Sequence, residues 1–289
     1  MFIFDKIYNF TKANQNEIPF IISSPHSGRH YPKEFLDITN FNNREIRVYE
    51  DFMIDKLYEF APDIGCKLLT NNIPRIIIDL NRSKNEIDKK MFRNFIDQKV
   101  EYSRKVSSGI GLFPRYIGYN GIYKDKLDWP IFESLIEEVY DVWHNKLYNE
   151  INEIADIYSN SVLLDCHSMS SLDLKGTRNI NLPDFVIGDL YNKSCKKEIT
   201  DFLLFFLKKE GFKVSINEPF AGDYILKKYG KPNKGINALQ IEIRKDLYCD
   251  ERNFILNESF SDIQSMLKRM IINLSYEMGY NRKLEISAE

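Results

Sequence analysis

Short runs of apolar residues, each bounded by polar or turn-forming residues, recur along the chain. A run of four to eight such residues is typical of a strand that is buried on both faces of a sheet. On this pattern the sequence predicts strands over residues 18–24, 75–80, 161–165, 185–188 and 236–243.

Apolar residues spaced three and four apart predict helices between these strands. This spacing occurs over residues 54–61, over a long stretch from 131 to 158 after Pro130, and over residues 263–278. Strands that alternate with helices favour an α/β sandwich with a mostly parallel sheet. Because ligands bind beyond the carboxyl ends of the strands in such sheets, the polar residues found there are the candidates for chemistry.

Polar side chains stand at the ends of four of the predicted strands. In chain order the candidates are His26, Asn81, Arg82, Asp165, His167 and Glu242. Glu242 lies within its own run, where polar residues alternate with apolar ones, so one face of that strand is polar near its end. Two of the chain's four histidines therefore lie at strand ends.

Two imidazoles and one carboxylate form a common ligand set for catalytic zinc. His26 and His167 offer the imidazoles, and Asp51, at the start of the helix predicted over residues 54–61, offers a carboxylate. Spacing alone leaves alternatives open, since Glu50 competes for this role. An aspartate at such a position is more often a helix cap, and either histidine can be an ordinary hydrogen-bonded residue at the sheet edge.

Glu242 and Arg82 also have two interpretations each. Glutamate is uncommon in strands and costly to bury without a partner, which favours a functional role for Glu242, but a salt bridge to Arg244 explains it equally. Arg82 could bind a carboxylate through two parallel hydrogen bonds or could belong to a structural ion pair.

The charge balance excludes several classes of partner. The 289 residues carry 40 basic and 42 acidic side chains, a formal charge of 40 − 42 = −2. No global field therefore attracts nucleic acid or an anionic membrane surface. Because no apolar stretch is long enough to span a membrane and no signal-peptide pattern is present, we expect a cytoplasmic protein.

Composition and spacing also limit the architecture. The four cysteines, Cys66, Cys166, Cys195 and Cys249, are too scattered for a zinc ribbon or a disulfide framework, so buried thiols are expected. No repeat or linker divides the chain, and residues 1–289 are expected to form one domain. The aromatic stretch over residues 202–206 is expected to lie in the core rather than at an interface, and the oligomeric state is left open.

Short motifs in a fixed order give the chain a family resemblance. They are ISSPHSG (22–28), ED (50–51), LY (57–58), IDLNR (78–82), GIGLFP (109–114), LDCHS (164–168), LPDF (182–185), GKP (230–232) and QIEI (240–243). From about residue 19 to about residue 248, this set resembles the N-formylglutamate amidohydrolases, also called N-formylglutamate deformylases.

The resemblance implies both a fold and an activity. The fold would be a three-layer α/β/α sandwich around a mixed sheet, similar to the zinc-dependent exopeptidases and aspartoacylases and to the phosphorylase/hydrolase-like proteins. The activity would be hydrolysis of the amide bond of N-formyl-L-glutamate, a small anionic molecule, to formate and L-glutamate at the end of a histidine degradation route.

Roles for individual residues also follow from the resemblance. It implies Zn²⁺, or another divalent metal, at His26, Asp51 and His167, with Glu242 as the general base that takes a proton from water. Arg82, Asn81 and Lys227 would lie near the substrate, Asp165 would orient an imidazole, and His30 and His144 would have structural or peripheral roles.

One segment departs from the family pattern. Residues 222–227 read GDYILK where the pattern is close to Gly-Gly-His-Ile-Thr-Arg, so Tyr224 and Lys227 replace a histidine and an arginine. A lysine offers a point charge without the planar fork of arginine, which leaves the substrate open. Another N-acyl amino acid, a peptide or a cell-wall fragment is the alternative substrate, and a non-catalytic binding protein of the same fold is the other alternative.

Overall fold

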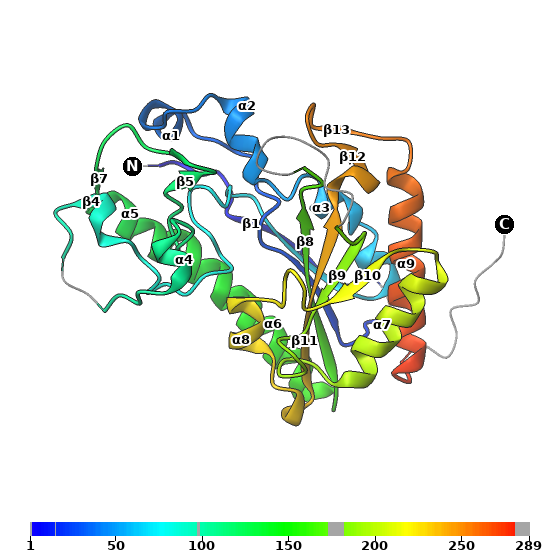
Figure 1. The fold of residues 1–289 in the computed structure, drawn as a ribbon. Coiled ribbons are helices and arrows are strands. Elements are labelled where there is room, and N and C mark those ends of the chain that lie inside the picture. Colours follow the sequence, from blue (N-terminus) through cyan, green and yellow to red (C-terminus); the bar gives the residue numbers. More distant parts are fainter. Residues whose placement is uncertain (1, 15, 97–98, 173–181, 281–289) are drawn as a thin grey trace.

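A seven-stranded sheet forms the centre of the computed structural model, which describes residues 2–14, 16–96, 99–172 and 182–280 (Figure 1). In spatial order the strands are β1 (Tyr8–Thr11), β3 (Lys67–Asn71), β2 (Phe20–Ser24), β8 (Ser161–Met169), β11 (Ile236–Arg244), β9 (Phe185–Gly188) and β10 (Val214–Ile216). Strands β1 and β3 pair antiparallel, as do β9 and β11, and the other four pairings are parallel. The sheet is therefore mixed and mostly parallel, as predicted.

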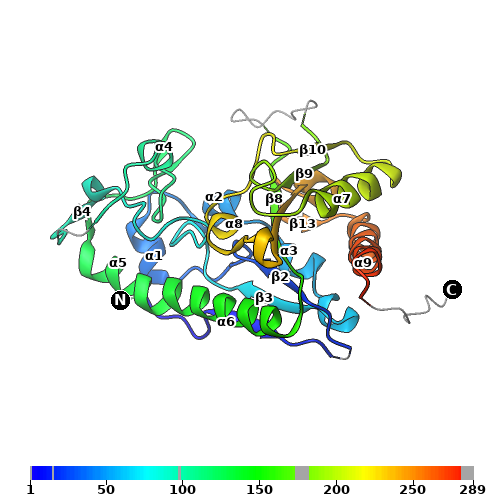
Figure 2. The same cartoon turned by 90° about the horizontal axis from the view of Figure 1, so that it is seen from below.

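Helices cover both faces of this sheet. One face carries α6 (Val142–Ile157) and α8 (Tyr224–Tyr229), and the other carries α3 (Ile54–Leu57), α7 (Lys197–Lys209) and α9 (Phe260–Glu277) (Figures 1 and 2). The remaining helices are α1 (Lys33–Ile38), α2 (Asn43–Ile46), α4 (Arg104–Ser107) and α5 (Trp129–Leu135). Short strands pair outside the main sheet: β4 (Phe92–Arg93) with β7 (Leu127–Asp128), β5 (Tyr116–Ile117) with β6 (Asn120–Gly121), and β12 (Cys249–Asp250) with β13 (Ile255–Leu256).

Strand alternation gives the molecule two hydrophobic cores. Leu163 faces the core beneath α6, whereas Leu164 faces the core beneath α7 and α9. Every residue of β8 and β11 is buried. Successive strand residues point to opposite faces, so both faces of these strands must be apolar where helices cover them. The three-layer α/β/α sandwich follows from this arrangement.

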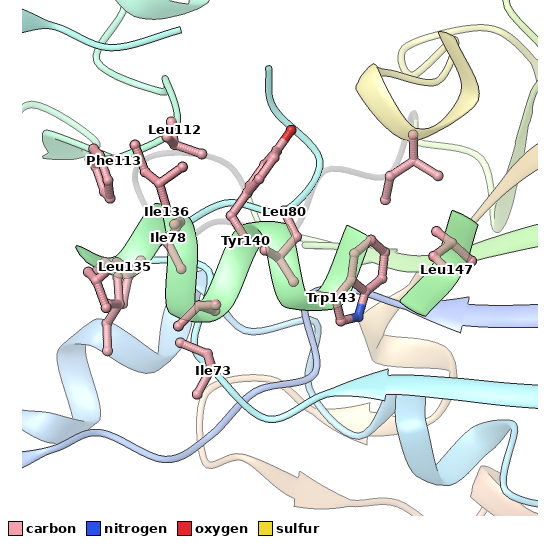
Figure 3. Close-up of a cluster of buried hydrophobic side chains, with 14 of the residues drawn as sticks. Ile73, Ile78, Leu80, Leu112, Phe113, Leu135, Ile136, Tyr140, Trp143 and Leu147 are labelled. Atoms are coloured by element: carbon pink, nitrogen blue, oxygen red, sulfur yellow. The ribbon is translucent and has the colours of Figure 1, made fainter. Parts of the chain in front are cut away.

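One predicted strand is wrong. Residues 75–80 form buried turns, in which the amide of Ile77 donates to the carbonyl of Pro74 over 2.9 Å. Their apolar side chains pack against the helical stretch that begins with α5, with Ile78 and Leu80 close to Leu112 and Tyr140 in Figure 3. Burial against a helix thus produces the same apolar run as burial within a sheet.

Three strands of the main sheet were not predicted: the edge strands β1 and β10, and β3 within the sheet. Lys67, Thr70 and Asn71 are polar but buried, and they leave an apolar run of two residues, which is too short to predict a strand. Lys67 is buried because Glu150 and Glu153 of α6 bind its ammonium group. Tertiary ion pairing therefore overrides the local pattern here.

The helix predictions have mixed outcomes. The stretch expected over residues 131–158 is helical from α5 to the end of α6, with a π-helical segment over Ile136–Asp141, and α9 matches the C-terminal prediction. The helix predicted over 54–61 is wrong in length, since α3 ends at Leu57 and a 3₁₀ turn follows over Ala61–Ile64. Pro62 in that turn fits the first positions of a helix and not its interior.

The aromatic stretch over residues 202–206 lies on α7, which was not predicted. Leu203 of this helix is buried against the sheet, whereas Phe205 is 67% exposed. The expectation that the whole stretch lies in the core is therefore wrong for Phe205. Among the described residues, no helix is both long enough and apolar enough to cross a membrane.

Candidate active site

The candidate site lies at the carboxyl ends of the parallel strands, on the face that α6 and α8 cover. Within the β8–β11 pair, His167 is the register partner of Glu242, and Asp165 is the partner of Gln240. These four residues share their sheet face with Leu163, which belongs to the core beneath α6. The polar residues therefore lie on the same face of the sheet as this core, closer to the carboxyl ends of the two strands.

His26 is positioned by a tight loop that follows β2. The side chain of Asn71 donates to the carbonyl of Pro25 over 2.8 Å, and the amide of Asp51 donates to the carbonyl of His26 over 3.1 Å. A Cβ atom on Gly28 would lie 2.2 Å from the carbonyl of Ile73, so only glycine fits where these two loops meet. The loop is thus fixed on both sides of His26.

Three buried side chains converge at this point. Asp51 Oδ2 lies 2.9 Å from His167 Nδ1 and 3.4 Å from His26 Nδ1, and one ligand atom from each residue lies within 4.8 Å of the others. His26 Nδ1 is buried and has no hydrogen-bond partner. Such an unpaired buried nitrogen, beside a second imidazole and a carboxylate, fits a metal ion of the kind that takes nitrogen and oxygen ligands. The group can therefore hold a metal.

Each histidine is also held from its far side. His26 Nε2 lies 2.8 Å from Asp79 Oδ1, and His167 Nε2 lies 2.9 Å from Asp165 Oδ2. A carboxylate at Nε2 accepts the hydrogen on that nitrogen, so a metal ion bound at the shared point would meet the lone pair of a neutral imidazole at Nδ1. Both imidazoles thus present the same nitrogen to the shared point.

Glu242 adjoins this group within the same cavity. Burial raises the pKa of Glu242 to about 7, with the charge of His167 opposing the shift and that of Asp51 adding to it. The side chain of Gln240 donates to Glu242 Oε1 over 2.9 Å. A carboxyl group whose pKa lies near neutrality can both accept and donate a proton at physiological pH.

The predicted ligand Asp51 and its competitor Glu50 point in different directions. The Glu50 carboxylate accepts hydrogen bonds from Tyr31 and from Arg47, and these partners hold it apart from the histidines. Asp51 reaches both histidines, as described above. The structure therefore brings Asp51, and not Glu50, to the candidate metal group.

The predicted substrate-binding residues lie in three different settings. Asn81 contacts Asp165 and His167 at 3.4 Å and accepts from the amide of Ile225, so its side chain faces His167. The guanidinium of Arg82 donates to the carbonyl of Ile110 and to the carboxylate of Asp223. The side chain of Lys227 is 61% exposed, with Nζ 3.6 Å from Asp223 Oδ1.

The two other histidines lie apart from the metal group. His30 is exposed, and its ring lies 6.4 Å from that of Phe4. His144 is buried, with Nε2 3.0 Å from the carbonyl of Leu80 and Nδ1 2.8 Å from the hydroxyl of Tyr229. Burial holds the pKa of His144 well below its usual value, so it is neutral.

Four further residues of the site were not assigned by the sequence analysis. They are Arg75, Asp79, Lys105 and Asp223. Asp79 binds His26, and Arg75 Nη2 donates to Asp79 Oδ2 over 2.8 Å. Asp79 belongs to the motif over residues 78–82, which was a usable signal, whereas Lys105 and Asp223 reach the site only through the tertiary fold.

A cavity of about 330 Å³ connects these groups. One part of its wall carries His26, His167 and Glu242, and another carries Arg82 and Asp223. A wider cleft of about 790 Å³ shares Arg82 and Phe220 with it. A small molecule in the cavity would thus contact both His26 and His167 of the metal-type group and the cations Arg82 and Lys105, which we call the cationic wall.

The fold and the donor set together define an α/β protein with a buried metal-type site of the kind used in hydrolysis. A family model described as N-formylglutamate amidohydrolase matches residues 18–249. The chain therefore belongs to the N-formylglutamate amidohydrolase family, which confirms the resemblance of its motifs.

Known relatives agree with this membership. An N-formylglutamate deformylase of Pseudomonas putida is 26% identical over 280 residues, which cover 96% of this chain and 98% of the relative. The structure of N-formylglutamate amidohydrolase from Ralstonia eutropha JMP134 is 27% identical, with a TM-score of 0.87 over 96% of this chain and 99% of that one. The gene product Atu2144 of Agrobacterium tumefaciens, at 15% identity and a TM-score of 0.70, shares the fold.

Proposed function

We propose that this chain hydrolyses the C–N amide bond of an N-formyl amino acid, with N-formyl-L-glutamate as the first substrate to test. The carrying observation is the convergence of His26, Asp51 and His167 on one point beside Glu242, in a cavity with cationic groups on its wall. The names of the relatives support the same reaction.

The proposed cofactor is Zn²⁺ held by His26 Nδ1, Asp51 and His167 Nδ1, with another divalent ion as the alternative. When bound, such an ion polarises the amide carbonyl and lowers the pKa of water. Asp79 and Asp165 would keep the two imidazoles in the tautomer that leaves Nδ1 free. Buried carboxylates at both Nε2 atoms support this assignment.

Glu242 is the proposed general base and acid. Its carboxylate would accept a proton from the attacking water and then donate a proton to the amide nitrogen as the C–N bond breaks, which releases formate and a free amine. Its location beside His167 on neighbouring strands supports this role, because it reaches the same cavity.

The other predicted residues would bind and orient the substrate. Asn81 lies beside His167 and Asp165 and has amide hydrogens for a carbonyl or carboxylate oxygen. Arg75 is proposed to hold one carboxylate because it lines the cavity, and Arg82 and Lys227 are proposed to hold a second one to the extent that Asp223, which contacts both, leaves room for it. A small anionic substrate needs such local positive charge, since the net charge of the chain is −2.

The proposed catalytic unit is a single domain. Support comes from the site itself, whose residues extend from His26 on the loop after β2 to Glu242 on β11, so that no division of the chain leaves the site complete. The expected bounds of residues 1 and 289 fall at positions that lie outside the described residues.

The test combines metal analysis with activity. Purified protein is assayed for bound zinc and for release of formate from N-formyl-L-glutamate, before and after treatment with a chelator and again after zinc is restored. We expect about one metal ion per chain, and activity that is lost with the metal and regained with it. A zinc-loaded protein that hydrolyses neither N-formyl amino acids nor N-acetyl amino acids would overturn the proposal, and turnover of peptides instead would support the alternative substrate class.

A further inference from the structure

The cationic wall of the cavity is already occupied by a carboxylate of the chain itself. Asp223 Oδ2 accepts hydrogen bonds from Arg82 Nη1 and from Lys105 Nζ, and Asp223 Oδ1 lies 3.6 Å from Lys227 Nζ. The side chain of Asp223 is 13% exposed and that of Arg82 is 9% exposed. Both oxygens of this carboxylate are thus paired with cations at the cavity wall.

The carboxylate of Asp223 is not used to cap the helix that follows it. Asp223 immediately precedes α8, where an aspartate would usually cap the helix amides, yet its side chain makes no capping hydrogen bond. Its backbone carbonyl instead accepts from the amide of Lys227 over 3.0 Å. The position is therefore anchored through the backbone, and the side chain is directed at Arg82 and Lys105.

The same carboxylate changes the charge that the cavity offers to a ligand. Arg75 also donates to Asp79, but its buried Nε has no hydrogen-bond partner, so Arg75 can hold one carboxylate of a substrate. Arg82 and Lys105 are the other cations that line the cavity. Without Asp223, these two cations could accept a second carboxylate of a substrate. With Asp223 in place, one of their two charges is neutralised, and the incoming carboxylate meets a like charge.

We propose that Asp223 is a specificity-determining residue that occupies the place of a substrate carboxylate at Arg82 and Lys105, so that the chain favours N-acyl amino acids with one negative charge over those with two. The inference rests on the proposed function for its substrate class. A substrate with a second carboxylate must displace Asp223 or bind beside it, and either event weakens binding without altering the reacting atoms. The discrimination therefore acts on KM.

The test compares N-formyl-L-glutamate with N-formyl-L-glutamine, which has the same shape and one charge fewer. For the zinc-loaded Asp223→Asn variant, we expect the ratio of kcat/KM for glutamate over glutamine to rise about tenfold, mainly through a lower KM for the glutamate compound. Asp201→Asn is the matched control, because it removes the same charge from an Asp–Lys pair on α7 that does not line the cavity. This control should leave the ratio unchanged.

A binding experiment separates this inference from the proposed reaction. Calorimetry measures the affinity of the zinc-loaded protein for glutarate, a dianion, and for glutaramate, its monoamide. We expect the Asp223→Asn substitution to raise the affinity for glutarate about tenfold and to change the affinity for glutaramate by no more than about twofold. Tighter glutarate binding by a variant that hydrolyses no N-formyl compound would support the role of Asp223 while overturning the proposed function.

Other outcomes overturn the role of Asp223. An unchanged glutarate affinity and an unchanged substrate ratio, in a variant that melts like the parent protein, would mean that Asp223 moves aside without cost. An equal loss for both substrates would mean a purely structural role. If Asp223→Asn does not fold, Asp223→Ser provides the same comparison, because serine also suits the position before a helix.

Discussion

Neighbouring acidic residues acquire different environments at the start of α3. Asp51 meets the two histidines, whereas Glu50 meets Tyr31 and Arg47. The sequence could not separate them, because both stand between the same elements and both offer a carboxylate. The direction of each side chain depends on how the loop around His26 packs against this segment.

This pair provides a prediction with its own control. Asp51→Asn should weaken zinc binding by at least about tenfold, because a neutral amide replaces the anionic ligand, whereas Glu50→Gln should retain zinc. Competition with a chromophoric chelator measures both affinities. Loss of zinc from Glu50→Gln but not from Asp51→Asn would assign the ligand to Glu50 instead.

The role of Glu242 is also a residue-scale prediction. Glu242→Gln keeps the shape of the side chain but removes its ability to accept a proton, so kcat should fall by about 10² to 10⁴. Bound zinc, measured by atomic absorption, should stay near the parent's level because Glu242 is outside the His–Asp–His group. Full activity in this variant would exclude Glu242 as the base.

At the scale of elements, the site depends on a segment that is neither helix nor strand. The carbonyls of Leu80 and Arg82 are bound by His144 and by the hydroxyl of Tyr140, both from the helical stretch that ends with α6. These contacts fix the loop that carries Asp79, Asn81 and Arg82. His144, which contacts no proposed metal or substrate group, thus helps to hold this loop in place.

The pairing of β3 with α6 depends on a buried ion pair. Lys67 is 1% exposed and binds Glu150, which is 6% exposed. Lys67→Met should lower the free energy of unfolding by about 2–3 kcal/mol at pH 7, because Glu150 stays buried with Lys146 as its remaining partner. Denaturant unfolding measures the loss. The double variant Lys67→Met with Glu150→Leu should recover stability, and a further loss there would contradict this explanation.

The pH dependence of this effect has a definite sign. Burial alone would raise the pKa of Glu150, but hydrogen bonds from Lys146 and Lys67 hold it below the ordinary value of 4.5. A carboxyl group with a lowered pKa contributes stability above its ordinary pKa and loses it as the pH falls through the folded-state value. The difference between Lys67→Met and the parent protein should therefore shrink below about pH 4.5 and be full at pH 7.

At the scale of the whole molecule, metal binding should be linked to folding. The residues His26, Asp51 and His167 come from three separate segments and meet only in the folded chain. A ligand that binds only the folded state stabilises it by about 2.7 kcal/mol at a hundredfold excess over its dissociation constant. Zinc should therefore raise the melting temperature and a chelator should lower it. A melting temperature that changes with neither zinc nor the chelator would argue against a metal site here.

Two expectations from the sequence concern the whole molecule: the state of its four cysteines, and its location and partners, which were inferred in part from the net charge of −2. All four thiols are buried and unpaired, as expected. The cytoplasmic location expected from the sequence remains a prediction, and so does the absence of nucleic-acid and membrane partners.

The sequence by itself determined the fold class and the strand ends near which His26, His167 and Glu242 lie, because alternation and periodicity are local properties of the chain. The ordered short motifs indicated the family. The sequence could not recognise β3, because buried polar residues leave only two apolar residues there. It could not recognise the buried turns over residues 75–80, because burial against a helix and burial within a sheet give the same apolar run. Only the tertiary structure decided that Asp51 and not Glu50 faces the histidines, and that the carboxylate of Asp223 binds Arg82 and Lys105. Those contacts join segments far apart in the sequence, and the directions of their side chains are set by packing.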